Sequence, residues 1–227
     1  MRLLAIAIAT VAAAGLAAPT LPTRNPVVVE LFTSQGCSSC PPADALLEEL
    51  SKRPDVIALA RPVTYWDRLG WKDTLAREEN TALQRTYAAK GGEGAGVYTP
   101  QTIVQGRFGT VGSRRDMVTQ HIGKAKSEIS AAIAVRPGLI GIDGKGAPAD
   151  VKLIDVKSSA IVRIGRGENG GRTVRYVNIV VSERSIGTWE GGAKTFATNA
   201  PRAAGSDKRL VVVQKAGAGP ILAAAWI

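Results

Sequence analysis

The sequence predicts an α/β unit followed by a small all-β unit of the antiparallel sandwich type. Over about residues 25–132, apolar runs of strand length alternate with helical patterns. Over residues 133–227, short apolar runs recur between glycine-rich turns, without helical stretches. The chain has 227 residues, 45% of them hydrophobic and 21% charged. It can therefore bury a sizeable core, and its composition is unlike that of a disordered protein.

Residues 1–17 have the pattern of a signal peptide. Arg2 supplies a positive charge, an apolar run follows, and Gly15 and Ala17 give the small-x-small site that a signal peptidase needs. The run is too short to span a membrane, and Pro19 breaks any continuation. An uncleaved anchor is the alternative. The pattern predicts a periplasmic or secreted protein, in a compartment where disulfides persist.

The first predicted strand, Val27–Phe32, leads into Cys37 and Cys40, which are the only two cysteines of the chain. A helical pattern begins at Pro41, whose missing N–H costs little in a first turn. Residues three apart at a helix start lie about 5–6 Å apart, a distance that a disulfide spans without backbone movement.

This spacing favours reversible redox chemistry. The N–H groups and the positive dipole end of the helix would stabilise a thiolate on Cys37, which makes it the expected attacking sulfur. Cys40 would then be the resolving partner. A static disulfide, or two unrelated thiols, is the alternative.

A second apolar run, Asp55–Val63, follows the helix. Strands joined by a helix lie parallel, so their carboxyl ends meet at one edge of the sheet. The loop after this strand, Thr64–Asp73, is rich in aromatic residues. We expect Trp66 and Trp71 to form an apolar wall for a substrate near the cysteines, with core packing of both as the alternative.

The remaining elements of the first unit follow in order. A helical pattern runs from about Thr74 to Lys90 and ends at a glycine-rich segment, 91–96. A hairpin is predicted over Val97–Val104 and Arg107–Val111, and a helix follows to about Ala132. Within the hairpin, Pro100 stands at a strand start, where the sheet tolerates proline.

This unit resembles a thioredoxin-fold domain, and Leu31–Cys40 is similar to the glutaredoxin-style approach to a dithiol. The pair Thr99–Pro100 matches the cis-proline that this superfamily places opposite the first cysteine. The resemblance implies a cis Pro100, with Thr99 offering backbone groups to a bound peptide. The whole combination looks like a family of exported bacterial thioredoxin-like proteins catalogued as a domain of unknown function, number 1223.

Some positions depart from the better-known relatives. The tryptophan before the first cysteine is Gly36 here, and the buried acid of thioredoxin is replaced by Leu31. Glu30 is one residue out of register, and we expect it to be a partly exposed residue at the strand edge, on the opposite face. A role as the acid through a β-bulge is the alternative. Ser38 and Ser39 stand where strong oxidants carry a Pro-His pair, so we expect a redox potential nearer the reducing or isomerising end.

The second unit, residues 133–227, contains seven predicted strand segments: Leu139–Ile142, Val151–Val156, Ala160–Ile164, Thr173–Val181, Ala193–Ala197, Leu210–Gln214 and Ile221–Ile227. The glycine-rich segment Gly165–Arg172 is interpreted as a flexible hairpin turn. A phosphate-binding loop is disfavoured, because no Gly-Lys-Ser/Thr follows and no helix starts there.

Net charge is +10 and unevenly placed, since residues 111–227 hold eighteen basic and nine acidic side chains. This basic half could contact an anionic envelope surface or simply be a soluble face. Nucleic acid is not an expected partner of an exported protein. The one histidine, His121, is predicted to be a surface residue, so neither a metal site nor another cofactor is expected.

The leading hypothesis is thiol–disulfide exchange on an exported protein or small thiol, with a separate redox partner. It assigns catalysis to Cys37 and Cys40 and substrate binding to Thr99, Pro100, Trp66 and Trp71. It requires both sulfurs to be accessible. The alternatives are a protein that binds and transfers a soft metal such as Cu(I), and a non-catalytic envelope protein with a structural disulfide.

Overall fold

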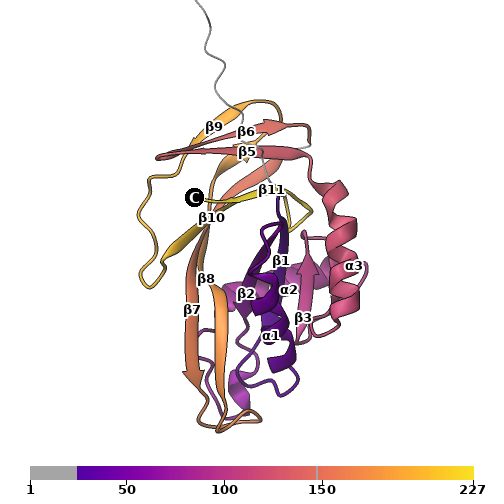
Figure 1. Ribbon diagram of the computed structural model, residues 1–227, viewed down its shortest axis with the longest axis vertical. Helices are drawn as coiled ribbons and strands as arrows, with labels where there is room; N and C mark the ends of the chain where they lie inside the picture. The colour runs from indigo at the N-terminus through magenta and orange to yellow at the C-terminus, as the bar shows by residue number, and fades with distance from the viewer. Residues whose placement is uncertain (1–24, 147) are drawn as a thin grey trace, which may run out of the picture.

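The computed structural model describes residues 25–146 and 148–227, and Figure 1 shows their arrangement. The predicted signal peptide, residues 1–17, lies outside the described residues. The fold is a mixed, sheet-rich α/β arrangement that contains one eight-stranded and one three-stranded sheet.

The first half of the chain contains these elements in order: β1 (Val27–Thr33), α1 (Pro41–Leu50), β2 (Val56–Pro62), a 3₁₀ turn (Asp67–Leu69), α2 (Glu78–Lys90), β3 (Gln101–Val104), β4 (Phe108–Val111) and α3 (Arg115–Ala125). Strands β1 and β2 are parallel, as the strand–helix–strand pattern predicts. The predicted hairpin is confirmed, because β3 and β4 pair in antiparallel fashion and β3 also pairs with β1.

The second half contains a 3₁₀ turn (Lys126–Glu128), β5 (Ala131–Arg136), β6 (Leu139–Gly144), β7 (Ala149–Arg163), β8 (Thr173–Trp189), β9 (Lys194–Ala197), β10 (Lys208–Lys215) and β11 (Ile221–Trp226). The large sheet has the order β11-β10-β7-β8-β2-β1-β3-β4, and the small sheet the order β5-β6-β9. Strands from both sides of the predicted boundary at residue 132 therefore share one sheet. The two groups join between β8 and β2 at one position, where Ala60 pairs with Ile179.

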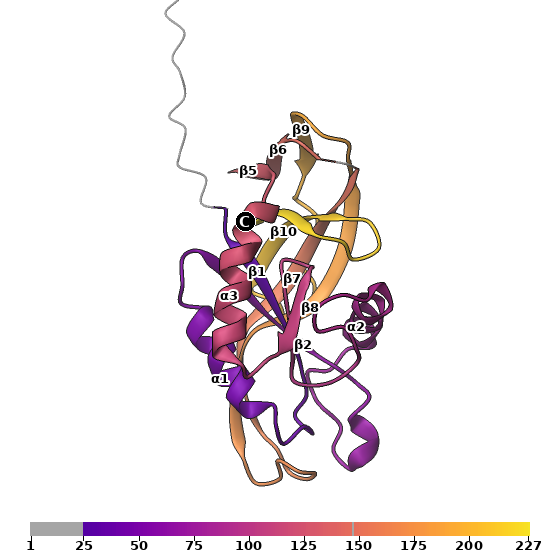
Figure 2. The ribbon, with the colours of Figure 1, turned by 90° about the vertical axis from the view of Figure 1, so that its right-hand side faces the viewer.

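Helices cover both faces of the sheet around β1. Figure 2 shows α1 and α3 on one side and α2 on the other. Val29 and Leu31 point to the first side, where they share a buried cluster with Leu47 of α1 and Ile122 of α3. This packing fixes the start of α1 against the end of β1, and both cysteines lie in that connection.

A buried polar network lies on the α2 side and links the two halves of the chain. Arg61 donates hydrogen bonds to Glu30 at 2.5 Å and to Glu183 at 2.8 Å. Tyr87 donates to the other oxygen of Glu30 at 2.7 Å, and Lys152 donates to Glu183 at 2.9 Å. The expected partial exposure of Glu30 is wrong, because partners from β2 and α2 satisfy its charge in the interior.

The predicted surface position of His121 is also wrong. Its side chain is fully buried in α3. The ring lies 5.6 Å from the Phe108 ring, between centroids, and its Nε2 is 2.9 Å from a carboxylate oxygen of Glu93. The glycine-rich segment that carries Glu93 folds over this face of α3 and shields the ring from solvent.

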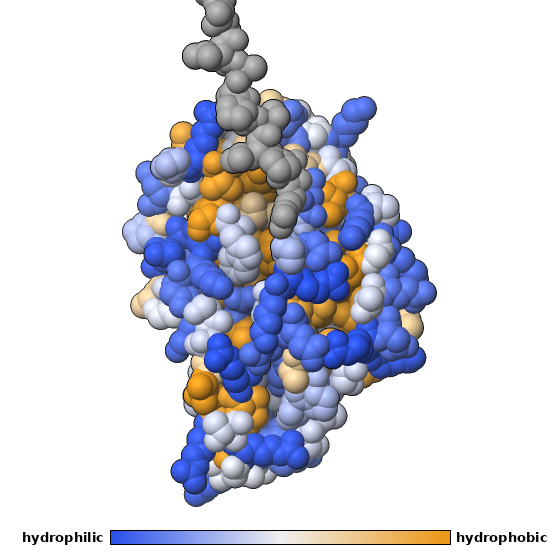
Figure 3. Space-filling model, in the orientation of Figure 1, coloured by the Kyte–Doolittle hydropathy of each residue, from blue (hydrophilic) through white to orange (hydrophobic). Residues whose placement is uncertain are grey.

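The face of the molecule in Figure 3 is mainly hydrophilic, with separate apolar patches. Ile161, on the outer face of β7, is the most exposed of the large hydrophobic residues described, at 70%. Within residues 25–146 and 148–227, no helix is both long enough and apolar enough to cross a membrane.

Candidate functional site

Cys37 and Cys40 form a disulfide immediately before α1. Their Cα atoms lie 5.4 Å apart, within the range expected from their spacing. Strand β1 ends at Thr33, a short turn follows, and Cys40 is the N-cap residue of α1. The sequence thus places both sulfurs at the junction between a central strand and a helix.

The stabilisation of a Cys37 thiolate by helix-end N–H groups stays a prediction, because the two cysteines form a disulfide here. The N–H groups at the start of α1 are already used. Pro41 and Pro42 have no N–H, and the next two N–H groups, of Ala43 and Asp44, both donate to the carbonyl of Cys40. The hydroxyl of Ser39 lies 3.4 Å from the sulfur of Cys37 instead. In the reduced protein this hydroxyl could donate to a thiolate on Cys37.

The turn before Cys37 is held by hydrogen bonds to its backbone. The N–H of Gln35 donates to Asp73 at 2.8 Å, and the N–H of Gly36 donates to the hydroxyl of Ser34 at 3.1 Å. The N–H of Cys37 donates to the carbonyl of Ser34 at 3.2 Å. Asp73 is buried, and burial raises the pKa of its carboxyl. The loop after β2 therefore orients the cysteine turn.

Both predicted tryptophans contact this region and are half-buried. Trp71 donates its indole N–H to the side chain of Gln35 at 2.8 Å. Trp66 donates to the hydroxyl of Thr99, also at 2.8 Å, and its Cβ would lie only 3.3 Å from a Cβ placed on Gly36. The absence of a side chain at Gly36 therefore lets Trp66 approach the turn before Cys37.

The Thr99–Pro100 peptide bond is cis, as the sequence resemblance implied. Thr99 is connected to the cysteine turn through Trp66, and Pro100 is buried. The structure thus brings Thr99, Trp66 and Trp71 to the surroundings of the disulfide. Substrate binding by these residues stays a prediction.

The expected accessibility of the two sulfurs is wrong for this state of the molecule. Both cysteines have 0% exposure. The turn between β7 and β8 lies over them, and Asn169 in that turn donates to the carbonyl of Cys37 at 2.7 Å. Sequence reasoning missed this contact, because the two residues are 132 positions apart and Asn169 looks like an ordinary turn residue.

A buried carboxyl lies one helical turn after the disulfide. Asp44 is 4% exposed and stands four residues after Cys40, so the two side chains share one side of α1. Thr33 donates a hydrogen bond to one oxygen of Asp44, and the other oxygen has no partner among the described residues. Burial raises the pKa of Asp44 to about 7, against the opposing effect of the Thr33 hydrogen bond.

Sequence reasoning also missed Asp44. The i, i+4 spacing from Cys40 was a signal that could have identified it, because it places an acid on the cysteine side of a helix whose neighbouring positions are apolar.

Most of the chain matches one protein family. The model of a family described as proteins of unknown function, DUF1223, matches residues 28–214. The chain belongs to this family. Among curated proteins, none matches this DUF1223 protein.

Two solved structures are similar to this DUF1223 protein. The X-ray structure of a protein from Agrobacterium tumefaciens is 29% identical, with a TM-score of 0.73, over 88% of this chain and 93% of that chain. HBP35 of Porphyromonas gingivalis is 12% identical, with a TM-score of 0.55, over 89% of this chain and 74% of that chain. The second likeness concerns the fold alone.

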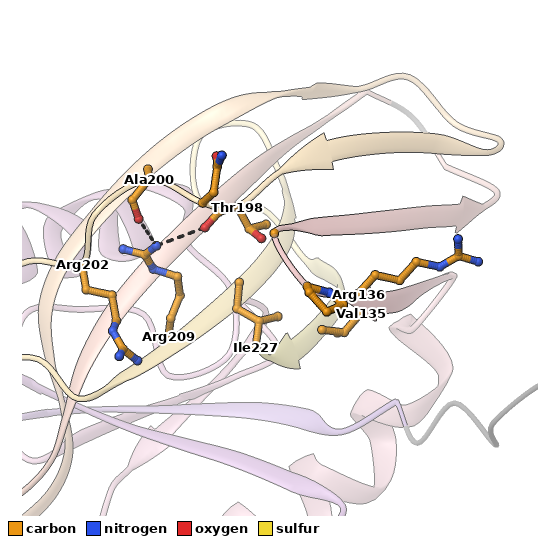
Figure 4. Close-up of a pocket in the computed structure, with 10 residues that line it drawn as sticks. Val135, Arg136, Thr198, Ala200, Arg202, Arg209 and Ile227 are labelled. Atoms are coloured by element: carbon orange, nitrogen blue, oxygen red, sulfur yellow. Dashed lines mark hydrogen bonds between the residues drawn. The ribbon is translucent and has the colours of Figure 1, made fainter.

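A separate cavity of about 640 Å³ lies beside the turn between β5 and β6, and Figure 4 shows the residues around it. Figure 1 places this turn at the top of the molecule and the turn between β7 and β8 at the bottom. Arg209 lines the cavity, but its guanidinium donates to Asp155 and to the carbonyls of Thr198, Ala200 and Pro201. Its donors are therefore already used inside the DUF1223 protein.

In the described part of the chain, the acidic and sulfur-bearing side chains do not form a metal cluster. Among the residues that the structure describes, no three Cys, His, Asp or Glu side chains are grouped so that they could hold a metal ion. The disulfide and Asp44 remain the candidate site of this DUF1223 protein.

Proposed function

We propose that this DUF1223 protein is an exported thiol–disulfide oxidoreductase with a thioredoxin-like first unit. One combination of features supports the proposal. The disulfide joins cysteines three positions apart, and the buried carboxyl of Asp44 lies one helical turn after Cys40. A static cross-link needs no titratable group beside it, whereas exchange needs a proton acceptor for the second thiol.

The proposed reaction starts from the reduced protein. The Cys37 thiolate attacks one sulfur of a substrate disulfide, a mixed disulfide forms, and the first substrate thiolate leaves. Cys40 then transfers its proton to Asp44 and attacks the sulfur of Cys37. The second substrate thiolate leaves and takes up that proton. The substrate gains two electrons, the Cys37–Cys40 disulfide forms, and a separate redox partner reduces it again.

The proposal assigns different tasks to the surrounding residues. Thr99 and Pro100 would hold the backbone of the substrate, and Trp66 and Trp71 would provide an apolar wall. Ser39 would donate to the Cys37 thiolate, since its hydroxyl lies 3.4 Å from the sulfur. The predicted signal peptide supports action outside the cytoplasm, on an exported protein or a small thiol.

A structural disulfide is the second candidate, and the complete burial of both cysteines favours it. A buried disulfide without access for a reductant serves to constrain the chain. The two candidates differ in whether a substrate can form a covalent adduct with Cys37.

The cysteine variants test the proposal. Reduced protein is incubated with a small aromatic disulfide that releases a coloured thiol, and adducts are followed by mass spectrometry. We expect one turnover per molecule of wild type, with release of two coloured thiols and formation of the Cys37–Cys40 disulfide. We expect none by Cys37→Ser, and accumulation of a one-to-one mixed disulfide by Cys40→Ser. The double variant Cys37→Ser/Cys40→Ser is the control for background reaction. Equal turnover by Cys37→Ser and the wild type would exclude the assigned mechanism.

A further inference from the structure

The turn that joins β7 to β8, residues 164–172, is here named the cover segment. Its backbone bonds to itself: the N–H of Ile164 donates to the carbonyl of Arg172 at 2.9 Å, and the N–H of Gly171 donates to the carbonyl of Ile164 at 2.8 Å. Gly167 and Gly171 have positive φ angles of 76° and 84°, which suit glycine. The cover segment therefore holds its own shape, independent of what it touches.

Two side chains attach the cover segment to the cysteine turn. Asn169 is 1% exposed, and its amide N–H groups donate to the carbonyls of Gln35 at 3.0 Å and Cys37 at 2.7 Å. The exposed carboxylate of Glu168 accepts from the N–H of Ser38 at 3.1 Å. These bonds attach the segment to the backbone on both sides of Cys37, and both cysteines have no exposed surface.

The shape of the cover segment also fits the aromatic loop. A Cβ placed on Gly165 would lie 2.8 Å from the Cζ3 atom of Trp71, closer than real Cβ contacts. A Cβ on Gly167 would lie 3.4 Å from the Cβ of Trp71. Trp71 in turn donates to Gln35, next to the cysteine turn. A side chain at position 165 would therefore require the Trp71 ring or the cover segment to shift.

The attachment has the features of a contact that can open. Within the cover segment only Ile164 and Asn169 are buried, and the oxygen of the Asn169 side chain has no partner among the described residues. The bonds to the cysteine turn are few and polar, which is typical of segments that open locally. Opening would free the carbonyl of Gln35 and the N–H of Ser38, and it would leave the carbonyl of Cys37 with its bond from the N–H of Cys40 alone. These groups could then bond to the backbone of an extended substrate.

We propose that the cover segment is a gate that shields the Cys37–Cys40 disulfide when closed and admits redox partners when it lifts away from Trp71 and the cysteine turn. The proposal deepens the proposed function, on which it rests for its biological role. Access itself is a property of the disulfide and can be measured without any substrate.

The test is the rate at which dithiothreitol reduces the disulfide of the folded, oxidised protein. In this reaction dithiothreitol is oxidised to its cyclic disulfide, and Cys37 and Cys40 become thiols. Samples are quenched, the free thiols are alkylated, and the mass increase is recorded. Because the reactive population is the open one, loss of the buried Asn169 bonds in Asn169→Ala should raise the rate about tenfold. Gly165→Ala should also raise it, through the contact with Trp71, and Glu168→Gln should raise it by about twofold.

Two controls separate gating from general destabilisation. Thr173→Ala changes an exposed residue of the same hairpin and should leave the rate unchanged. Ile140→Val trims a buried residue of the small sheet, far from the disulfide, and reports how much reduction follows from lower global stability alone. Rates of Asn169→Ala and Gly165→Ala that equal the wild type, or that rise no more than in Ile140→Val, would overturn the gate.

The gate and the proposed function can fail separately. If the gate variants react faster but Cys40→Ser forms no adduct even when combined with Asn169→Ala, the gate stands and the oxidoreductase proposal fails. If Cys40→Ser forms its adduct while the gate variants are reduced at the wild-type rate, the oxidoreductase proposal stands and the gate is excluded.

Discussion

The hydroxyl of Thr33 donates a 2.8 Å hydrogen bond to the carboxyl of Asp44, across the gap between the end of β1 and the first turn of α1. This bond is the only one that the Asp44 side chain makes among the described residues, and the group is enclosed in the interior, where the like charge of Asp73 also opposes its ionisation. Enclosure disfavours the ionised form, which is why the pKa of Asp44 rises to about 7.

Asp44→Asn should change how stability depends on pH. Because the pKa of Asp44 in the folded protein lies above its unfolded value of 3.8, its contribution to stability is full below that value and is lost as pH rises through about 7. Between pH 4 and pH 8 the free energy of unfolding of the oxidised wild type should fall by about 4 kcal/mol relative to that of Asp44→Asn. Urea unfolding at a series of pH values measures this difference, and parallel curves would contradict it.

The same substitution should affect the second step of exchange more than the first. Attack by Cys37 does not involve Asp44, whereas release of the mixed disulfide needs the proton of Cys40 to be removed. We expect Asp44→Asn to accumulate the adduct with a model disulfide at pH 7, with release slowed about a hundredfold. Above the ordinary pKa of a thiol, Cys40 loses its proton without help, so release in Asp44→Asn should approach the wild-type rate. A slow release that does not depend on pH would argue against a proton-transfer role for Asp44.

A buried ion pair stabilises the second half of the chain. Arg209 donates to the two carboxylate oxygens of Asp155 at 2.6 and 3.0 Å, and both side chains are buried. Burial opposes ionisation of Asp155, but the hydrogen bonds, chiefly that from Arg209, prevail and lower its pKa to about 2.

Asp155→Leu should lower the free energy of unfolding by about 3–5 kcal/mol at pH 7, because it leaves the guanidinium of Arg209 buried without its counter-charge. The double variant Asp155→Leu/Arg209→Met should recover most of this loss. Since the folded pKa of Asp155 is depressed, the wild type should also lose stability as pH falls from about 4 towards 2. Guanidinium unfolding compares the three proteins, and a single variant as stable as the wild type would refute the assignment.

Local patterns were sufficient to predict β1, α1, β2 and the β3–β4 hairpin. Their apolar spacing and turn residues agree with the elements found. One strand was divided in error: Val151–Val156 and Ala160–Ile164 belong together in β7. The polar residues Lys157 and Ser159 between them stay paired with Ile179 and Val177 of β8, so their polarity does not end the strand.

Contacts between distant segments could not be read from the sequence. Glu30 is buried because Arg61 and Tyr87 reach it from β2 and α2. His121 is buried because Glu93 and Phe108 close over it. In the candidate site the two cysteines were recognised from their spacing, whereas the role of Asn169 depends on a turn placed over them by the long β7–β8 hairpin. Each of these depends on tertiary packing.

The equilibrium potential of the Cys37–Cys40 couple tests the central claim most directly. The folded protein is equilibrated in dithiothreitol and glutathione buffers of known potential, and the reduced fraction is counted by alkylation. An exchange protein should give a midpoint between about −270 and −180 mV, in the range of reducing and isomerising catalysts. A midpoint below about −300 mV would identify the disulfide as a structural cross-link and contradict the account.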